Sequence, residues 1–423
     1  MAGRITAAKS LRLLTSSSAQ TLTANIINTA FGVVTGVATA RGMDPSDRGV
    51  LVALILWTST VATFSVLGLD ESVVFSSGGN ADRSRSLRSG LSRHLRNQVF
   101  AGVVVVLVID LAIARGQANT TLIAAIALAL MVPLNAYIQL KFAQLRVEQK
   151  FSKWNLLRLI PAGVYSLIAA ALAVTSNLTV ASGSGALVLG TATTALVARV
   201  AIHDSRGAQS SAETVTASRR YGRRLVLANI PYMANQRLDQ LLLGLLAAPA
   251  VLGVYAVAVS FAALVQIVGT SVEQVLFPRM ASGYLDPRRI PRLIAGVVFA
   301  LCVAIVPLAI FAKRLIELVY GGPYVEAERP LQILLVGTVM VVVSMILTAE
   351  AKALGRLTAL LRAQLWGMGI TAVTLFPAVY YAGLSGAALS STAAYSFVAV
   401  VLWRSRSRSV EPNLSRPNAG EIQ

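Results

Sequence analysis

Residues 83–114 read RSRSLRSGLSRHLRNQVFAGVVVVLVIDLAIA, a basic segment followed directly by a long apolar run. An α-helix needs about 20 apolar residues to cross the roughly 30 Å hydrocarbon core of a bilayer, and the run from 97 to 114 is close to that length. Basic gaps and apolar runs alternate in the same way along the whole chain. This pattern predicts a membrane protein with many transmembrane helices.

The composition supports this prediction. The chain has 423 residues and a formal net charge of +19, yet only 13% of its residues are charged and 55% are hydrophobic. An ordinary globular domain has about 25% charged residues. A basic soluble domain would be a candidate for binding nucleic acid. The low charge content argues against that class, so we expect membrane lipids around the chain and no nucleic acid partner.

We expect about twelve membrane-spanning helices, and the predicted fold class is therefore an all-α polytopic membrane protein. The expected spans are residues 19–40, 50–77, 97–114, 121–140, 156–175, 182–200, 224–246, 252–277, 293–312, 330–350, 363–381 and 385–403.

The basic residues are divided unequally between the two alternating sets of gaps. Thirty of the 37 Lys and Arg residues lie in the set that includes both termini, and six lie in the other set. Lys and Arg in short loops stay on the cytoplasmic side of a membrane. We therefore expect a multi-pass protein of the bacterial plasma (inner) membrane with both termini in the cytoplasm. The first apolar run has full length, which favours a transmembrane helix over a signal peptide.

The second half of the chain repeats short stretches of the first half. Ala24-Asn25-Ile26 recurs as Ala228-Asn229-Ile230, and Pro45, Gly49 and Val50 recur 204 positions later as Pro249, Gly253 and Val254. Two similar six-helix halves are typical of transporters that bind their substrate between the halves. We expect an N-terminal lobe at 1–200, a cytoplasmic linker at 201–220, a C-terminal lobe at 221–404 and a basic tail at 405–423. The lobes are pseudo-symmetric and surround a central cavity; the alternative is a duplicated bundle without one.

Arg237 is the basic residue expected deep inside a span. A charged side chain at the centre of a bilayer costs about 2.5–3.5 kcal/mol or more, so it should face a cavity or a partner. Arg237 belongs to the run Asn235-Gln236-Arg237-Leu238-Asp239-Gln240, which together with Asn229 would form a wide polar face on a continuous helix. Two hypotheses remain open. The guanidinium receives an anion of a ligand, or it forms an ion pair between helices.

Two asparagines in the first expected span, Asn25 and Asn28, are further candidates. Their amides either line the same cavity or hydrogen-bond neighbouring helices. We expect no catalytic residues and no metal ligands in the chain.

Acidic residues are expected at the cytoplasmic ends of two spans. Asp70 and Glu71 lie at one such end, and Glu273 lies at the matching end in the second half. They form a gate or a cation site, or they are interfacial acids that meet the basic loops. Asp110 is expected near the outer end of its span, in contact with solvent.

Several motifs resemble the polysaccharide transporter family, the lipid-linked oligosaccharide flippases related to multidrug and toxin extrusion proteins. The resemblance extends over nearly the whole chain and depends on the order of its motifs. These are ARGMDPSDRG at 40–49, RLDQLLLG at 237–244, LGVYA at 252–256, LFPR at 276–279, LVYGGPY at 318–324 and GLSGAA at 383–388.

The resemblance implies alternating access and the flipping of an isoprenoid-pyrophosphate-linked oligosaccharide in surface polysaccharide biosynthesis. It assigns the pyrophosphate to Arg237, with Arg41 as a second contact, and the coupling of protons or sodium to Asp239 and Glu273. The implied partners are the lipid-linked glycan and the glycan polymerase and glycosyltransferases of the same pathway. No cofactor is expected.

Two other functions remain open. The same fold supports a cation-coupled exporter of drugs or small solutes. A membrane glycan polymerase or ligase is the third candidate, but such an enzyme should carry catalytic residues on a long outer loop. The outer loops here are short, and both histidines, His94 and His203, lie in basic loops on the expected cytoplasmic side.

Overall fold

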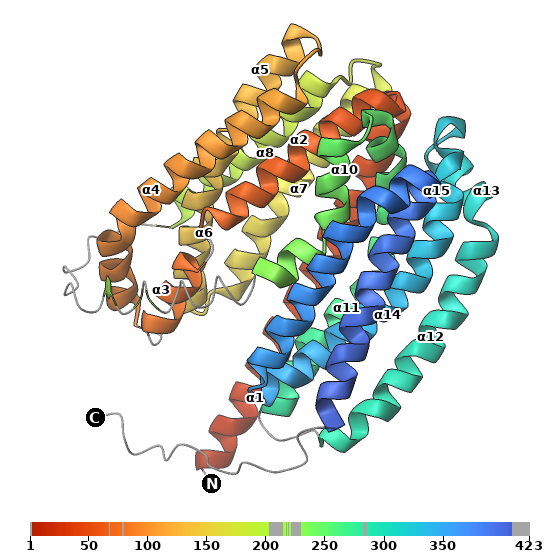
Figure 1. The fold of residues 1–423 in the computed structure, drawn as a ribbon. Helices are drawn as coiled ribbons and strands as arrows, with labels where there is room; N and C mark the ends of the chain where they lie inside the picture. Colours follow the sequence, from red (N-terminus) through yellow and green to blue (C-terminus); the bar gives the residue numbers. More distant parts are fainter. Residues whose placement is uncertain are drawn as a thin grey trace.

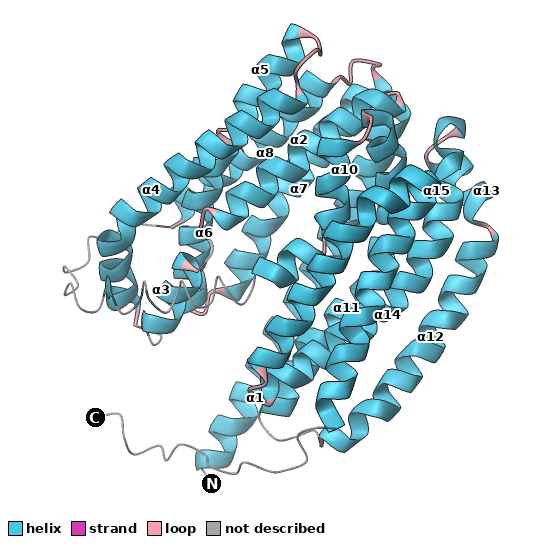
Figure 2. Ribbon diagram, in the orientation of Figure 1, coloured by secondary structure: helices cyan, strands magenta, loops and turns pink. Residues whose placement is uncertain are grey.

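The computed structural model describes residues 2–66, 68–77, 80–202, 215, 216, 218, 220, 230–281 and 286–407. Within these residues the chain forms helices joined by short loops and contains no strand (Figure 2). The predicted all-α fold class is therefore confirmed. Most of the expected linker at 201–220 and the tail after Ser407 lie outside the described residues.

The helices form two lobes (Figure 1). In the N lobe, α1 packs along α7, and α7 packs on α8. Its helices are α1 (Ala2–Gly42), α2 (Pro45–Phe64), α3 (Leu69–Ser77), α4 (Ala81–Ile113), α5 (Asn119–Leu128), α6 (Met131–Val147), α7 (Phe151–Val174) and α8 (Val180–Ala201).

In the C lobe, α14 packs against both α11 and α15. The helices of this lobe are α10 (Leu238–Leu246), α11 (Pro249–Ala281), α12 (Ile290–Ile310), α13 (Ala312–Val319), α14 (Glu328–Ala353) and α15 (Leu357–Ser407), with short 3-10 turns at Pro287–Arg289 and Gly322–Ala327.

Nine helical segments of the described chain are long and apolar enough to cross a membrane. One of them, Leu357–Arg406, contains both spans expected at 363–381 and 385–403. The two spans follow each other directly and are separated by a kink at Gly383 (φ 55°, ψ −137°). The spans expected at 19–40 and 224–246 are not among the nine. The first is rich in Asn, Thr and Gly, and part of the second lies outside the described residues.

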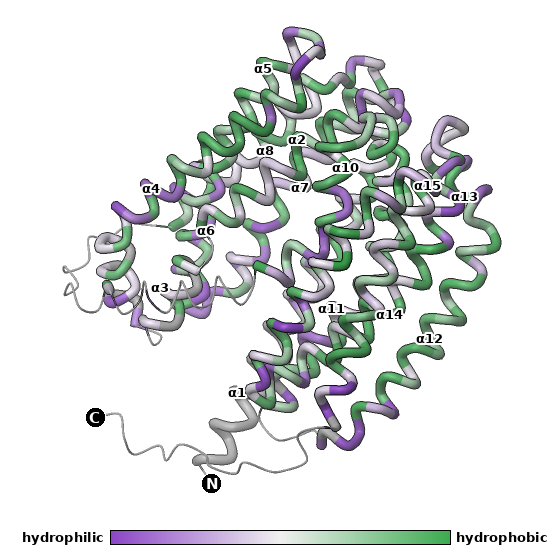
Figure 3. The backbone as a smooth tube through the Cα atoms, in the orientation of Figure 1, coloured by the Kyte–Doolittle hydropathy of each residue, from purple (hydrophilic) through white to green (hydrophobic). Residues whose placement is uncertain are grey.

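Hydrophobic residues make up most of the length of these helices (Figure 3), and many large apolar side chains are exposed. Phe100, Leu167 and Val373 are 70%, 70% and 74% exposed, which suits contact with lipid rather than water. Together with the nine apolar segments, this surface makes the chain a multi-pass membrane protein.

The sequence determines both ends of α2. The Asp44 carboxylate accepts a hydrogen bond from the backbone N–H of Asp47 at 2.9 Å, and Pro45 occupies the first helical position. After Phe64 the chain turns, with Gly68 at a φ of 84°, which a helix does not allow. The continuous span expected at 50–77 is therefore wrong, and α3 follows as a separate helix.

The lobes converge at the end of the molecule away from the start of α1 and the end of α15, and they diverge toward the start of α1 and the end of α15 (Figure 1). We call the converging end, where α2 and α11 begin, the closed end. There α2 packs against α11 and α10 of the C lobe.

The residues that repeat between the two halves form the closed end. A methyl group added to Gly49 would lie 1.7 Å from the carbonyl oxygen of Pro249, and one added to Gly253 would lie 2.0 Å from that of Pro45. Only glycine allows the two backbones to approach so closely. The sequence repeat therefore corresponds to a pair of matching contacts between the lobes.

A buried arginine strengthens this contact. Arg48 is only 2% exposed, and its guanidinium donates a hydrogen bond to the carbonyl of Gly253. The same guanidinium lies 5.1 Å from the ring centre of Tyr324 and 5.7 Å from that of Tyr320. Aromatic faces stabilise a desolvated cation, so Arg48 joins α2 to three segments of the C lobe.

Candidate functional site

The candidate site begins at a break in the helix that leads into α10. Residues 230–235 are helical, Gln236 and Arg237 form a turn, and α10 starts at Leu238. The continuous helix expected across 224–246 is therefore wrong at this point. The start of a helix is its electropositive end, and here it lies next to a guanidinium. This combination suits an anionic ligand.

Arg237 faces the N lobe from this break. Its side chain is exposed, and its Nη1 lies 3.5 Å from the Ser59 hydroxyl of α2. Among the described residues, no carboxylate forms an ion pair with Arg237. An accessible guanidinium without an acidic partner favours the ligand hypothesis over the ion pair between helices.

Asp239, two residues further on, lies in a different environment. It is 3% exposed and accepts hydrogen bonds from the Tyr255 hydroxyl at 2.6 Å, the Ser391 hydroxyl at 2.8 Å and the backbone N–H of Gln240 at 2.8 Å. Three donors stabilise a carboxylate in an apolar interior. Asp239 therefore joins α10 to α11 and α15, inside the C lobe.

The other polar residues of this segment do not form one face. Gln236 is half-buried in the turn, Gln240 is buried in α10, and Asn235 is buried and donates to the Gln364 side chain at 3.2 Å. Asn229 lies outside the described residues. Of the described polar residues of this run, only Arg237 and Gln236 are accessible.

The N lobe contains a separate pocket of about 260 Å³ between α1, α6, α7 and α8, with a largely apolar lining that includes several polar side chains. Asn28 lines this pocket, and Asn25 accepts a hydrogen bond from Arg158 Nη2 at 3.2 Å. Its other polar lining residues are Asn135, Gln139, Arg158 and Thr191. Asn25 therefore forms an interhelical hydrogen bond, one of the two expected alternatives, whereas Asn28 lines a pocket that does not include Arg237.

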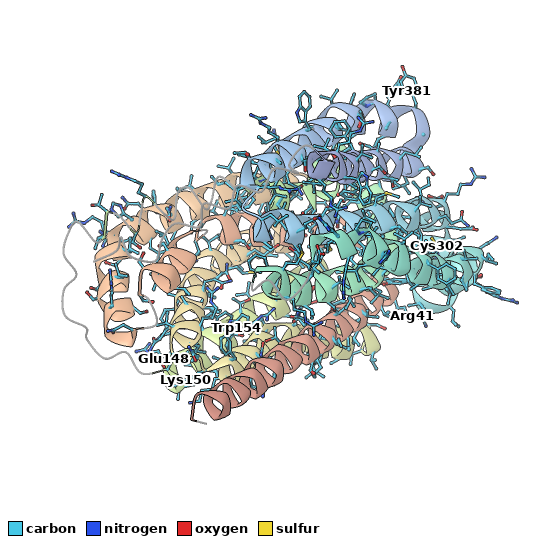
Figure 4. All side chains as sticks on the ribbon, turned by 90° about the horizontal axis from the view of Figure 1, so that it is seen from below. Arg41, Glu148, Lys150, Trp154, Cys302 and Tyr381 are labelled. Atoms are coloured by element: carbon cyan, nitrogen blue, oxygen red, sulfur yellow. The ribbon has the colours of Figure 1, made fainter. Side chains whose placement is uncertain are left out.

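Arg158 is the cation of this pocket. Its guanidinium lies 4.6 Å from the ring centre of Trp154, which Figure 4 labels, and no described carboxylate pairs with it. Arg158 lies only two residues after the start of the span expected at 156–175, and it is one of the thirty basic residues counted with the cytoplasmic gaps. In the structure α7 begins at Phe151, so Arg158 is inside the helix.

Arg41 serves the contact between lobes. It donates to the carbonyl of Val319 at 2.9 Å and to that of Leu318, at the C-terminal end of α13. Figure 4 shows it at the end of α1 beside C-lobe helices. A cation is favourable at the electronegative end of a helix. Its neighbours differ from those of Arg237, and the structure does not bring the two arginines into contact.

The expected gating acids are only partly described. Glu273 of α11 forms an ion pair with Lys352 of α14 at 3.0 Å, within the C lobe. Asp70 and Glu71 belong to α3, but their side chains lie outside the described residues. Among the described residues, no cluster of three or more His, Cys, Asp or Glu could hold a metal ion.

Asp110 differs most from expectation. It was expected in contact with solvent, and this is wrong, because the side chain is 0% exposed. Its Oδ2 accepts a hydrogen bond from the Thr58 hydroxyl at 2.6 Å, and its Oδ1 has no hydrogen-bond partner. The apolar run at 97–114 signals a span but not which face of the helix Asp110 occupies.

The sequence model of a family described as "Polysaccharide biosynthesis protein" matches residues 38–329. The match includes the closed end, Arg158 and Arg237. The chain belongs to this family. A comparison with curated proteins finds no match.

The fold is similar to that of solved transporter structures. A lipid II flippase MurJ in an inward closed conformation has a TM-score of 0.77 at 12% identity, covering 91% of this chain and 86% of that one. A multidrug resistance MATE family transporter of the MOP superfamily has a TM-score of 0.70 inward-facing, at 15% identity and coverage of 90% and 94%. An outward-facing MATE structure gives 0.62 at 16% identity, with 94% and 95% covered. The predicted two-lobe fold is thus confirmed.

Proposed function

We propose that the chain flips an isoprenoid-pyrophosphate-linked oligosaccharide across the bacterial plasma membrane by alternating access. The observation that carries the proposal is the exposed Arg237 guanidinium at the break before α10, which lacks an acidic partner among the described residues. A guanidinium offers paired donors that match the oxygens of a phosphate. Family membership in polysaccharide biosynthesis and the likeness to a lipid II flippase support this substrate class.

The orientation follows from the charge distribution. With both termini in the cytoplasm, as the excess of basic residues in their gaps predicts, the closed end faces outward and the lobes diverge toward the cytoplasm. This conformation would admit a substrate from the cytoplasmic leaflet. Separation of Gly49 from Pro249 and of Gly253 from Pro45 would then release it outside.

The N-lobe pocket supplies contacts for the glycan. Asn28, Asn135 and Gln139 offer amide donors and acceptors, as sugar hydroxyls require. Arg158 adds a cation that would accept an acidic sugar. In this proposal the pyrophosphate binds at Arg237 with Gln236, and the glycan extends toward α1 and α7.

Coupling to protons or sodium is assigned to the C lobe. Asp239 connects α10, which carries the Arg237 break, to α11 and α15 through Tyr255 and Ser391. A change in the charge it carries would alter these contacts. Glu273 is already paired with Lys352, so it is the weaker candidate.

The test uses the full chain in liposomes and a fluorescent isoprenyl-pyrophosphate disaccharide, whose transfer is followed by quenching from outside. We expect Arg237→Ala to slow transfer about 10- to 100-fold, because a hydrogen bond to a charged group contributes about 1.5–3 kcal/mol. Arg237→Lys should retain part of the rate, since Lys keeps the positive charge but lacks the paired N–H donors of a guanidinium. Lys153→Ala, an exposed cation of the same sign, is the control.

A second probe distinguishes the flippase from an exporter of drugs or small solutes. The same disaccharide on a neutral isoprenyl ether should be flipped slowly by both wild type and Arg237→Ala. Equal rates for both probes in the wild type, or an unchanged rate of the pyrophosphate probe in Arg237→Ala, would contradict the binding of a pyrophosphate by Arg237. Transport of a lipophilic organic cation in place of either probe would favour the exporter.

A further inference from the structure

Asp110 is a buried acid that the proposed transport function does not use. It lies on α4, three residues before the end of the helix, and is 0% exposed. Its one hydrogen-bond partner is the Thr58 hydroxyl of α2, with 2.6 Å between the two oxygens. The second carboxyl oxygen is buried and has no hydrogen-bond partner in the described part of the chain.

Among the side chains that the structure describes, none carries a charge that compensates an ionised Asp110. The charged residues of the described helices packed on α4 are Asp47 and Arg48 at the start of α2 and Lys141 and Arg146 near the end of α6. None of them interacts with Asp110, whose only described partner is Thr58. On α3, which also contacts α4, Asp70 and Glu71 follow the opposite end of α2, and their side chains are not described.

The contacts fit a neutral carboxyl group. An ionised carboxylate would bury a full charge with a single donor, which is strongly unfavourable in an apolar interior. A protonated carboxyl can donate from Oδ2 to the Thr58 oxygen over the same 2.6 Å, and it then leaves only a carbonyl-type oxygen unpaired. Asp239 is the contrasting case, because three donors satisfy its charged form.

Asp110 is connected to the closed end through α2. The residues on both sides of Thr58 contact the C lobe: Trp57 donates to the carbonyl of Leu241 at 3.2 Å, and Ser59 lies 3.5 Å from Arg237 Nη1. A cavity of about 310 Å³ lies beside the end of α4, lined by Ala112, Ile113 and Arg115 of the N lobe and by residues of α10 and α11. Gly49, Val50 and Ala53 of α2 also line this cavity, so movement of α2 away from the C lobe would enlarge it and let water reach further along α4.

We propose that Asp110 is a proton-binding residue of the N lobe, and that it releases its proton when the closed end opens. The proton leaves the carboxyl oxygen for water entering the cavity beside α4. In the open form water then hydrates the charged carboxylate, whereas in the closed form the buried position of Asp110 excludes this hydration. Because protonation favours the buried position, a rise in pH shifts the protein toward the open form of this end.

Infrared spectroscopy tests the proton directly on the full chain in liposomes, without any substrate, so its outcome is separate from that of the flippase proposal. We expect a protonated-carboxyl C=O band at neutral pH that is lost in Asp110→Asn and kept in Asp239→Asn. Thr58→Val should move the band to higher frequency, because the acid loses its hydrogen bond. A wild-type spectrum without the band, or a band unchanged in all three variants, would overturn the proposal.

The link to the closed end is tested by the distance between spin labels at Gln117→Cys and Ala248→Cys in a Cys302→Ser background. Both positions are exposed and lie on opposite lobes at this end. We expect the long-distance population to grow as the pH rises in wild type and to stay small in Asp110→Asn at every pH. The same pH response in both proteins would contradict the coupling.

Discussion

The two lobes match at the closed end and differ in their interiors. Gly49 and Gly253 make equivalent contacts with the carbonyls of Pro249 and Pro45. Inside, the C lobe has an accessible arginine at a helix break and a fully hydrogen-bonded Asp239. The N lobe has Arg158 shielded by Trp154, with a poorly satisfied Asp110.

The difference indicates a division of roles between similar halves. A two-lobed gate needs matching surfaces where the lobes meet, and the repeated residues provide them. Binding of a substrate needs a cation, and coupling to an ion needs an acid. Arg237, Asp239 and Asp110 are such residues, and none of them belongs to the repeated stretches. The predictions for the glycines and for the buried aspartates compare the N lobe with the C lobe, and the prediction for Arg41 and Arg48 compares two N-lobe cations that contact the C lobe.

The largest effect is expected from Gly49→Ala and Gly253→Ala. A single methyl group at either position would lie 2.0 Å or less from a carbonyl oxygen of the other lobe, so the closed end must separate. Spin labels at Gln117→Cys and Ala248→Cys should then show mainly long distances in both variants.

The control for these glycines is Gly185→Ala, since a methyl group there meets nothing within 4 Å. It should keep the wild-type distance. If only one of Gly49→Ala and Gly253→Ala opened the closed end, the two glycine contacts would not contribute equally to holding the lobes together.

An intermediate effect is expected at the two buried aspartates. Tyr255→Phe removes a donor from a charged Asp239 and should lower the free energy of unfolding by about 1–3 kcal/mol. Thr58→Val removes the partner of a neutral Asp110 and should cost about 0.5–1.5 kcal/mol. Equilibrium unfolding in detergent, followed by circular dichroism, measures both. A larger loss for Thr58→Val would indicate that Asp110 is charged.

The smallest effect is expected at Arg41. Its side chain is exposed, and an exposed cation at a helix end contributes about 0.3–1 kcal/mol. Arg41→Gln should therefore lower the free energy of unfolding less than Arg48→Gln, because Arg48 is buried between two tyrosines. The same unfolding measurement ranks the two, and an equal loss would show that burial of Arg48 adds nothing.

Local patterns in the sequence were sufficient for the membrane class, but the span that corresponds to α2 was expected to begin at residue 50 and begins at Pro45. The length of an apolar run predicts a membrane-spanning helix, because each residue contributes separately to the free energy of transfer into hydrocarbon. Asp44 and Pro45 mark a helix start through contacts within one turn. The Gly68 turn was missed because the apolar pattern continues across it.

The site was less predictable than the fold. Arg237 was singled out because a charge inside an apolar run is costly wherever it lies. The helix break that exposes it is not marked by a Gly or Pro in the run 235–240. The hydrogen bonds of Asp239 come from Tyr255 and Ser391, 16 and 152 residues further along the chain.

The sequence by itself determined that the chain crosses the membrane many times, that its halves repeat and that Arg237 is an unusual cation. The tertiary structure alone decided that the repeated glycines meet across the closed end, that Arg158 lies in a pocket and that Asp110 is buried beside Thr58. The physical reason is that transfer into lipid depends on local composition. The partner of a polar group depends on which helix faces are brought together.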